Sequence, residues 1–175
     1  STYGLLKAIR SHTISSPTVR ESLDFGRPNA CNQCHLDKPL GWTADQLAKR
    51  YGHRRPLLTS VQNLVPASID WVLRGDASQR ALGAWSMGWS EARRTSGTNW
   101  LPEAMLPLLN DPYEAVRLIA WRSLRKDARF KRVNYDPLAS EEERLAAISE
   151  LRERAHGQGD PELGPIDPME LINDP

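Results

Sequence analysis

The stretch that decides the fold is residues 101–125, "LPEAMLPLLNDPYEAVRLIAWRSLR". Apolar residues recur at helical spacing on both sides of Asn110-Asp111-Pro112. They are Leu101, Ala104, Met105 and Leu108 before it, and Val116, Ile119, Ala120 and Leu124 after it. Asp111 can cap a helix that has Pro112 at its first position. The stretch therefore predicts one helix over 100–109 and a second helix that starts after Asp111.

The same stretch resembles a HEAT repeat, in which two antiparallel helices are joined by Asp-Pro and the second helix carries Val-Arg, here Val116-Arg117. The resemblance covers one repeat, whereas a solenoid needs at least ~3 repeats to bury its faces. It implies a single HEAT-like hairpin that packs on neighbouring helices.

Helical patterns continue on both sides of this hairpin. We expect further helices over 43–50, 68–74, 77–94 and 141–155, and a connector over 56–66. Thr43 and Asp76 are the expected caps of two of them, and Gly52 is the expected stop of the first. Ser140 and Glu143 form a capping box for the last. No stretch alternates as a strand does, so the sequence predicts a mainly α protein in which residues 67–155 contain no sheet.

The chain divides into three parts. Glycine and proline interrupt residues 11–40, so we expect residues 1–56 to form a loop-rich segment. Residues 57–156 form the helical HEAT-like lobe, whose last helix carries Leu145, Ile148 and Leu151 on one side. Residues 157–175 are rich in proline, glycine and aspartate and are expected to form an extended tail.

Composition limits the function. The 175 residues are 39% hydrophobic, which is enough for one domain with a core. The 23 lysines and arginines nearly balance the 22 acidic residues, so no overall basic field favours nucleic acid. No apolar run approaches the ~20 residues that cross a bilayer, and Ser1-Thr2-Tyr3 does not begin a signal peptide. We expect no membrane span.

Both cysteines lie in Cys31-Asn32-Gln33-Cys34-His35. A c-type haem needs two thiols about one turn apart, one for each vinyl group, with an imidazole beside them for the iron. Cys31, Cys34 and His35 meet this requirement, so the motif favours one covalently attached haem with His35 as the proximal iron ligand.

Two alternatives for the cysteines remain open. A redox disulfide is expected at the start of a helix that follows a strand, and this context is missing from the sequence pattern. A structural zinc site needs four ligands, and the other histidines, His12, His53 and His156, are scattered.

The wider sequence resembles a segment of multihaem cytochromes c. "SHTISSP" (residues 11–17) and "RPNACNQCHLDKPLGWTADQL" (residues 27–47) carry this resemblance, which extends over helical residues to about Tyr135. It implies an exported, periplasmic or extracellular electron carrier, with other haem proteins or subunits as partners. Such proteins usually have several Cys-x-x-Cys-His motifs, and this chain has one. It is therefore either a one-haem relative or part of a longer chain.

The second iron ligand is expected to be His12, whose counterpart in these relatives is an axial ligand. The other candidates are His53, His156, Met87, Met105, Met169 and water. Met87 lies on an apolar helix face between Trp85 and Trp89, where core packing is the simpler role. The six tryptophans are expected to line the core, with one or two against the porphyrin. Four basic residues could pair with haem propionates: Arg27, Lys38, Arg54 and Arg55.

These observations predict an electron-transfer protein with one haem c and bis-histidine, low-spin iron. No pairing of a nucleophile with a general base stands out in the sequence, so nothing in it indicates an enzyme. Two other classes remain: a HEAT-like interaction module with a structural haem, and a haem sensor or peroxidase-like enzyme with an open sixth position.

Overall fold

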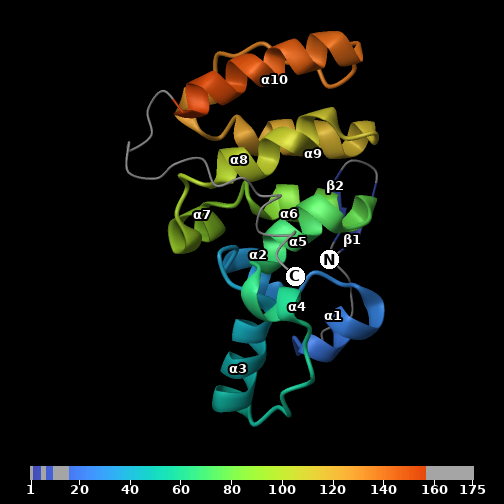
Figure 1. Ribbon diagram of the computed structural model, residues 1–175, viewed down its shortest axis with the longest axis vertical. Helices are drawn as coiled ribbons and strands as arrows, with labels where there is room; N and C mark the ends of the chain where they lie inside the picture. The colour runs from blue at the N-terminus through green and yellow to red at the C-terminus, as the bar shows by residue number, and fades with distance from the viewer. Residues whose placement is uncertain (1, 5–6, 10–15, 157–175) are drawn as a thin grey trace.

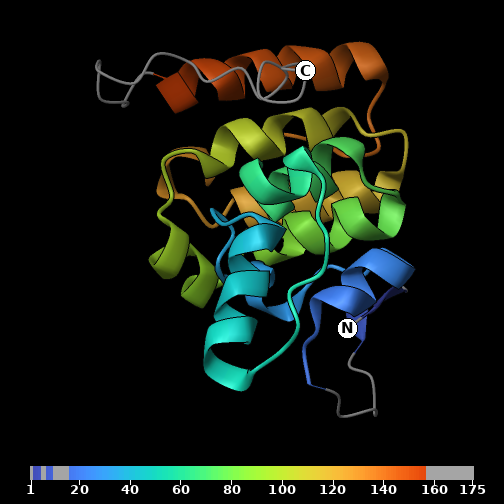
Figure 2. The same ribbon diagram turned by 60° about the horizontal axis from the view of Figure 1, so that its bottom comes forward.

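The computed structural model describes residues 2–4, 7–9 and 16–156 of the chain. Within these ranges the protein is mainly helical, as the sequence predicts. Figure 1 shows the helices stacked roughly in chain order, from α1–α4 at one end through α5–α9 to α10 at the other, and Figure 2 shows the same order from a second direction. Residues 67–155 contain helices and turns and no strand, which confirms the prediction for this part.

A small antiparallel hairpin precedes the helices and was not expected. Its strands are β1 (Thr2–Gly4) and β2 (Lys7–Ile9), and Tyr3 is paired with Ala8. Three residues per strand are too few to show an alternating pattern in the sequence.

The segment before residue 40 is more helical than expected. It contains α1 (Val19–Phe25) and α2 (Ala30–Cys34). Thr18 caps α1 by accepting a hydrogen bond from the Glu21 N–H at 3.2 Å. These helices have seven and five residues, so neither is long enough to display a 3.6-residue period. The expectation of irregular chain around the cysteines is wrong for these two stretches.

Two further helices lie between residues 40 and 64. Helix α3 (Leu40–Tyr51) starts three residues earlier than expected, and Thr43 is buried inside it instead of capping it. Gly52 ends α3 in the left-handed region with φ of 68°, as the sequence predicts. The expected connector contains α4 (Ser60–Leu64), which begins with a Thr59 and Gln62 capping box.

The main core forms around α5 (Ala67–Arg74), α6 (Ala77–Ser86) and α9 (Glu114–Leu124). Asp76 caps α6, as predicted, by accepting from the Gln79 N–H at 2.8 Å. The helix expected over 77–94 is instead two helices, because the chain turns at Met87-Gly88-Trp89 before α7 (Ser90–Ser96). A Cβ on Gly88 would lie 2.6 Å from Ser123 Oγ, so α9 needs glycine at this turn.

The stretch of residues 101–125 forms α8 (Leu101–Met105), a 3-10 turn η1 (Leu106–Asn110) and α9. Pro107 has no N–H to continue the α-helical pattern, which explains the change to η1. Helix α9 begins at Glu114, later than predicted. The Asp111 carboxylate accepts from the Tyr113 N–H at 2.8 Å and pairs with Arg80 at 2.6 and 3.1 Å. Both helical regions of the hairpin are therefore present, with shifted boundaries.

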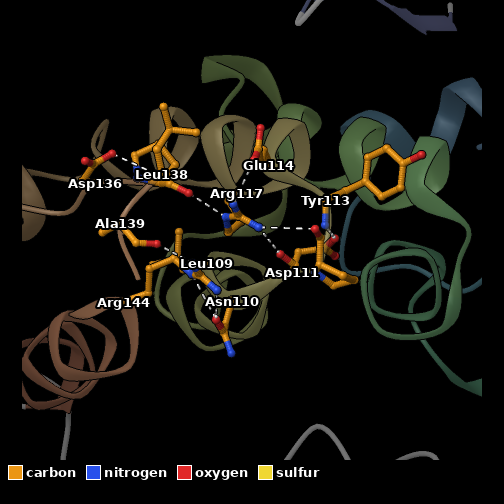
Figure 3. Close-up of polar contacts among 12 residues, drawn as sticks. Leu109, Asn110, Asp111, Tyr113, Glu114, Arg117, Asp136, Leu138, Ala139 and Arg144 are labelled. Atoms are coloured by element: carbon orange, nitrogen blue, oxygen red, sulfur yellow. Dashed lines mark hydrogen bonds and ion pairs between the residues drawn. The ribbon is translucent and has the colours of Figure 1, made fainter. Parts of the chain in front are cut away.

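The buried side chain of Arg117 joins the two turns that flank α9 (Figure 3). Its Nε donates to the Pro137 carbonyl and its Nη1 donates to the Asp111 carbonyl, both at 2.7 Å. The Tyr135 hydroxyl donates to the Leu109 carbonyl. These bonds satisfy buried carbonyl groups that have left the helical ladders.

Helix α10 (Glu141–His156) covers the α8 and α9 layer. The predicted capping box is present, with the Ser140 N–H donating to Glu143 Oε2 at 2.9 Å and the Glu143 N–H donating to Ser140 Oγ at 3.3 Å. Of the three apolar residues expected to be buried, Ile148 and Leu151 are in the core and Leu145 is 50% exposed.

Candidate functional site

Cys31 and Cys34 lie on the single short helix α2. The buried Asn29 caps this helix, because its Oδ1 accepts from the Cys31 N–H at 3.0 Å while its Nδ2 donates to the Thr18 carbonyl at 3.1 Å. At the other end, the His35 N–H donates to the Cys31 carbonyl at 2.9 Å. The two thiols are three residues apart and therefore lie on the same side of one helical turn.

The two residues between the cysteines anchor α2 to the protein. Asn32 is fully buried, and its Nδ2 donates to the Lys38 carbonyl at 2.8 Å while its Oδ1 accepts from the Thr43 hydroxyl at 2.7 Å. Gln33 is also buried, and its Nε2 donates to the Pro28 carbonyl at 3.1 Å. With these amides held inward, Cys31 and Cys34 are left half-buried at the surface. The burial of Asn32 and Gln33 could not be expected from their polarity, because asparagine and glutamine are mostly exposed.

The chain after Cys34 is fastened to α5 and α7. Ser96 Oγ donates to the Cys34 carbonyl at 3.0 Å and accepts from the Leu36 N–H at 2.8 Å. Ser68 Oγ donates to the Leu36 carbonyl at 2.6 Å, and the Leu36 side chain is fully buried in the main core. The position of the cysteine turn therefore depends on residues 60 or more positions away from it in the sequence as well as on its neighbours.

His35 is half-buried against Trp42 of α3, with the ring centroids 4.6 Å apart and the ring planes at 48°. No residue within 16–156 forms a hydrogen bond with either ring nitrogen of His35. Trp42 thus limits the orientation of the His35 ring. Neither nitrogen of that ring is used by another residue within 16–156.

The thiols have an environment that keeps them protonated. Burial raises the pKa of the Cys31 thiol above its ordinary value of 9.0. Burial and, second, the negative charge of Glu91 raise the pKa of the Cys34 thiol. A redox-active Cys-x-x-Cys pair depends on the opposite shift, toward a stable thiolate. This arrangement does not favour the disulfide alternative.

A structural metal held directly by the cysteines would need further ligands beside them. Within residues 16–156, no three side chains among the histidines, cysteines, aspartates and glutamates converge as metal ligands. Thioether attachment has a different requirement, since the two sulfur atoms and the imidazole bind different atoms of the haem. The arrangement of α2 fits this requirement.

The candidates for the second iron ligand lie in different places. Met87 and Met105 are fully buried in the main core, which agrees with the packing role expected for Met87. His53 is half-buried after α3, and His156 Nε2 lies 3.5 Å from Glu103 Oε1 at the end of α10. His12 and Met169 lie outside the described residues, so the preference for His12 remains a prediction.

Two of the four basic residues considered for propionates already have carboxylate partners. Lys38 Nζ is 2.6 Å from Asp37, and Arg55 Nε is 2.6 Å from Asp45. Arg27 lies over the Phe25 ring, and both Arg27 and Arg54 are exposed. Arg55 is exposed as well, so Arg27 and Arg54 differ from it in having no carboxylate partner within residues 16–156.

The tryptophans are distributed much as predicted. Trp71 and Trp121 are buried, and three more pack against the main core while partly exposed: Trp85, Trp89 and Trp100. The sixth, Trp42, is the one that contacts the motif, through His35.

Comparison with protein-family models, curated proteins and solved structures finds no match for this chain. None of the helices in the described part of the chain is long and apolar enough to span a membrane.

Proposed function

We propose that this chain is an electron-transfer c-type cytochrome that carries one haem, bonded to Cys31 and Cys34 and ligated by His35. The observation that supports the proposal best is the anchoring of α2. Asn32 and Gln33 are held inside the protein, which leaves two half-buried thiols on one side of a turn and an imidazole next to them. This is the placement that two vinyl groups and an iron require.

The protonated thiols suit covalent attachment. Cys31 and Cys34 would hold the haem by adding across its two vinyl groups, so that each sulfur would bond to one vinyl carbon while a hydrogen would be added to the other. The reaction is an addition and consumes no oxidant. Burial raises the pKa of the Cys31 and Cys34 thiols, which favours the protonated form of both side chains.

The bound group supplies an iron that gains and loses one electron, and the protein holds it and adjusts its potential. Trp42 packs against the His35 ring and restricts its rotation. We propose that His12 would supply a second imidazole to the iron, which would favour a low-spin iron with a lower potential than a methionine ligand would give. The resemblance to multihaem cytochromes supports a periplasmic or extracellular location, with redox proteins or other haem subunits as partners.

The proposal is tested by producing the chain in a host that attaches haem c and measuring its intact mass in denaturant. We expect the 19.7 kDa polypeptide plus one haem. The matched control is the double variant Cys31→Ser/Cys34→Ser, which should show the polypeptide mass alone. A wild-type mass without haem, or haem that is extracted by acid and acetone, overturns the proposal.

The visible spectrum of the same sample tests the electron-transfer assignment. Bis-histidine ligation predicts a low-spin spectrum that does not change when carbon monoxide or cyanide is added at low concentration. A high-spin spectrum with rapid ligand uptake contradicts the electron-transfer role and favours a sensor or peroxidase-like enzyme.

A further inference from the structure

A basic surface lies where α9 ends and the chain turns toward α10. We define it as the six cationic residues of 122–132, namely Arg122, Arg125, Lys126, Arg129, Lys131 and Arg132. Five of them are exposed, and Arg129 is half-buried. The same eleven residues contain one acidic side chain, Asp127.

The single carboxylate in this segment is already paired. Asp127 accepts from Arg129 Nε at 3.1 Å and from Arg129 Nη2 at 2.8 Å, and Arg93 of α7 lies 3.7 Å from it. Lys126 Nζ donates to the Gly88 carbonyl at 2.6 Å, a neutral group, and Arg125 lies over the Trp121 ring.

Four cations of the basic surface have no carboxylate partner within residues 16–156: Arg122, Arg125, Lys131 and Arg132. Like charges that lie near one another in a segment repel unless an anion neutralises them. The basic surface therefore has a net positive charge that the described part of the chain does not compensate.

The end of α10 lies directly against this surface. Arg129 Nη1 donates to the Ala155 carbonyl at 3.3 Å, and α10 ends at His156. Figure 1 shows this end of α10 on the same side of the molecule as α7, and Figure 2 agrees. Whatever follows residue 156 starts beside the basic surface.

The sequence that follows has the complementary charge. Residues 157–175 contain five acidic residues and no lysine or arginine. The acidic residues are Asp160, Glu162, Asp167, Glu170 and Asp174. Asp160 is only four residues beyond the last helical residue. A short covalent connection gives such a segment a high effective concentration at the surface, so weak ion pairs are enough to hold it there.

We propose that residues 157–175 dock on the basic surface of their own chain. The contact is electrostatic and lies next to α7, whose Ser96 holds the cysteine turn. A partner with an acidic surface that approaches this side would compete with residues 157–175 for the same cations. This docking rests only on the charges and positions of the residues involved, so it does not require that the proposed haem is bound.

Limited proteolysis with an endoprotease specific for glutamate tests the docking, because Glu162 and Glu170 lie within the docked segment. The test variant is Lys131→Gln/Arg132→Gln in the 175-residue chain, which removes two cations without adding a cleavage site. The matched control is Lys49→Gln/Arg50→Gln, which removes two adjacent exposed cations on α3. We expect cleavage after Glu162 to become about fivefold faster in the test variant, from the loss of two exposed ion pairs, and to be unchanged in the control.

Salt and protein concentration complete the test. Wild-type cleavage should accelerate in 0.5 M sodium chloride, because exposed charges are screened. This measurement needs no variant, so it remains valid if the double substitution affects folding. Equal cleavage in the test and control variants, or no effect of salt, overturns the proposal. Protection that rises with protein concentration also overturns it, since the segment would then bind a second copy.

Discussion

Replacing Asn32 with Ala tests whether the residue between the cysteines anchors the site. The substitution removes the acceptor of the Thr43 hydroxyl and the donor to the Lys38 carbonyl. Thr43 is fully buried, so water cannot replace the lost partner. A buried polar group without a partner costs about 1–3 kcal/mol. The Lys38 carbonyl still accepts from the Ala67 N–H at 3.1 Å, so only the Thr43 hydroxyl loses its partner, and we expect the free energy of unfolding to fall by about 1–3 kcal/mol.

Urea denaturation followed by circular dichroism measures this loss, with Asn134→Ala as the control. Asn134 is exposed and forms no hydrogen bond within residues 16–156, so its replacement should change stability by less than about 0.5 kcal/mol. The variant Asn32→Ala/Thr43→Val removes the unpaired hydroxyl as well and should recover part of the loss. A fall of less than about 1 kcal/mol in Asn32→Ala would refute the reasoning, because it would mean that the buried amide does not hold α2.

Three further predictions concern other parts of the protein. His12→Ala should convert the low-spin haem spectrum to a high-spin one, and an unchanged spectrum removes His12 from the iron. Gly88→Ala should destabilise the protein by about 1–3 kcal/mol in urea denaturation, because a Cβ would lie 2.6 Å from Ser123 Oγ; a neutral effect contradicts the close packing of this turn on α9. Burial raises the pKa of Tyr135 to about 12, so the folded state keeps its proton where the unfolded state loses it, and stability should fall between pH 10 and 12. Tyr135→Phe should remove that part of the alkaline loss, and identical pH profiles for the two proteins count against the shift.

The start of a helix could be predicted where the residues that cap it lie within a few positions of one another in the sequence. Asp76 and Ser140 cap α6 and α10 through residues three positions later, and these contacts are visible in the sequence. The misplaced boundaries have a different cause. The break at Gly88 depends on the closeness of Ser123 in α9, and the start of α9 depends on the bond between Asp111 and Arg80 of α6. Contacts between distant segments do not appear in a local pattern.

The candidate site shows the same division. The spacing of Cys31, Cys34 and His35 was sufficient to propose haem attachment, because that chemistry depends on residue types within one turn. The placement of that turn depends on the buried side chain of Asn32 and on the hydroxyl of Ser96. The sequence does not distinguish an asparagine whose side chain is buried from one whose side chain is exposed.

The sequence by itself predicted the mainly helical character of the protein, and the spacing of Cys31, Cys34 and His35 was the basis for proposing a haem site. The tertiary structure decided which side of α2 faces solvent, where α6 and α9 end or begin, and that the end of α10 lies against Arg129. The physical reason is the sequence separation over which each interaction acts. Caps, helical periods and motif spacing act over three or four residues, whereas burial and hydrogen bonding are fixed only when segments tens of residues apart pack together.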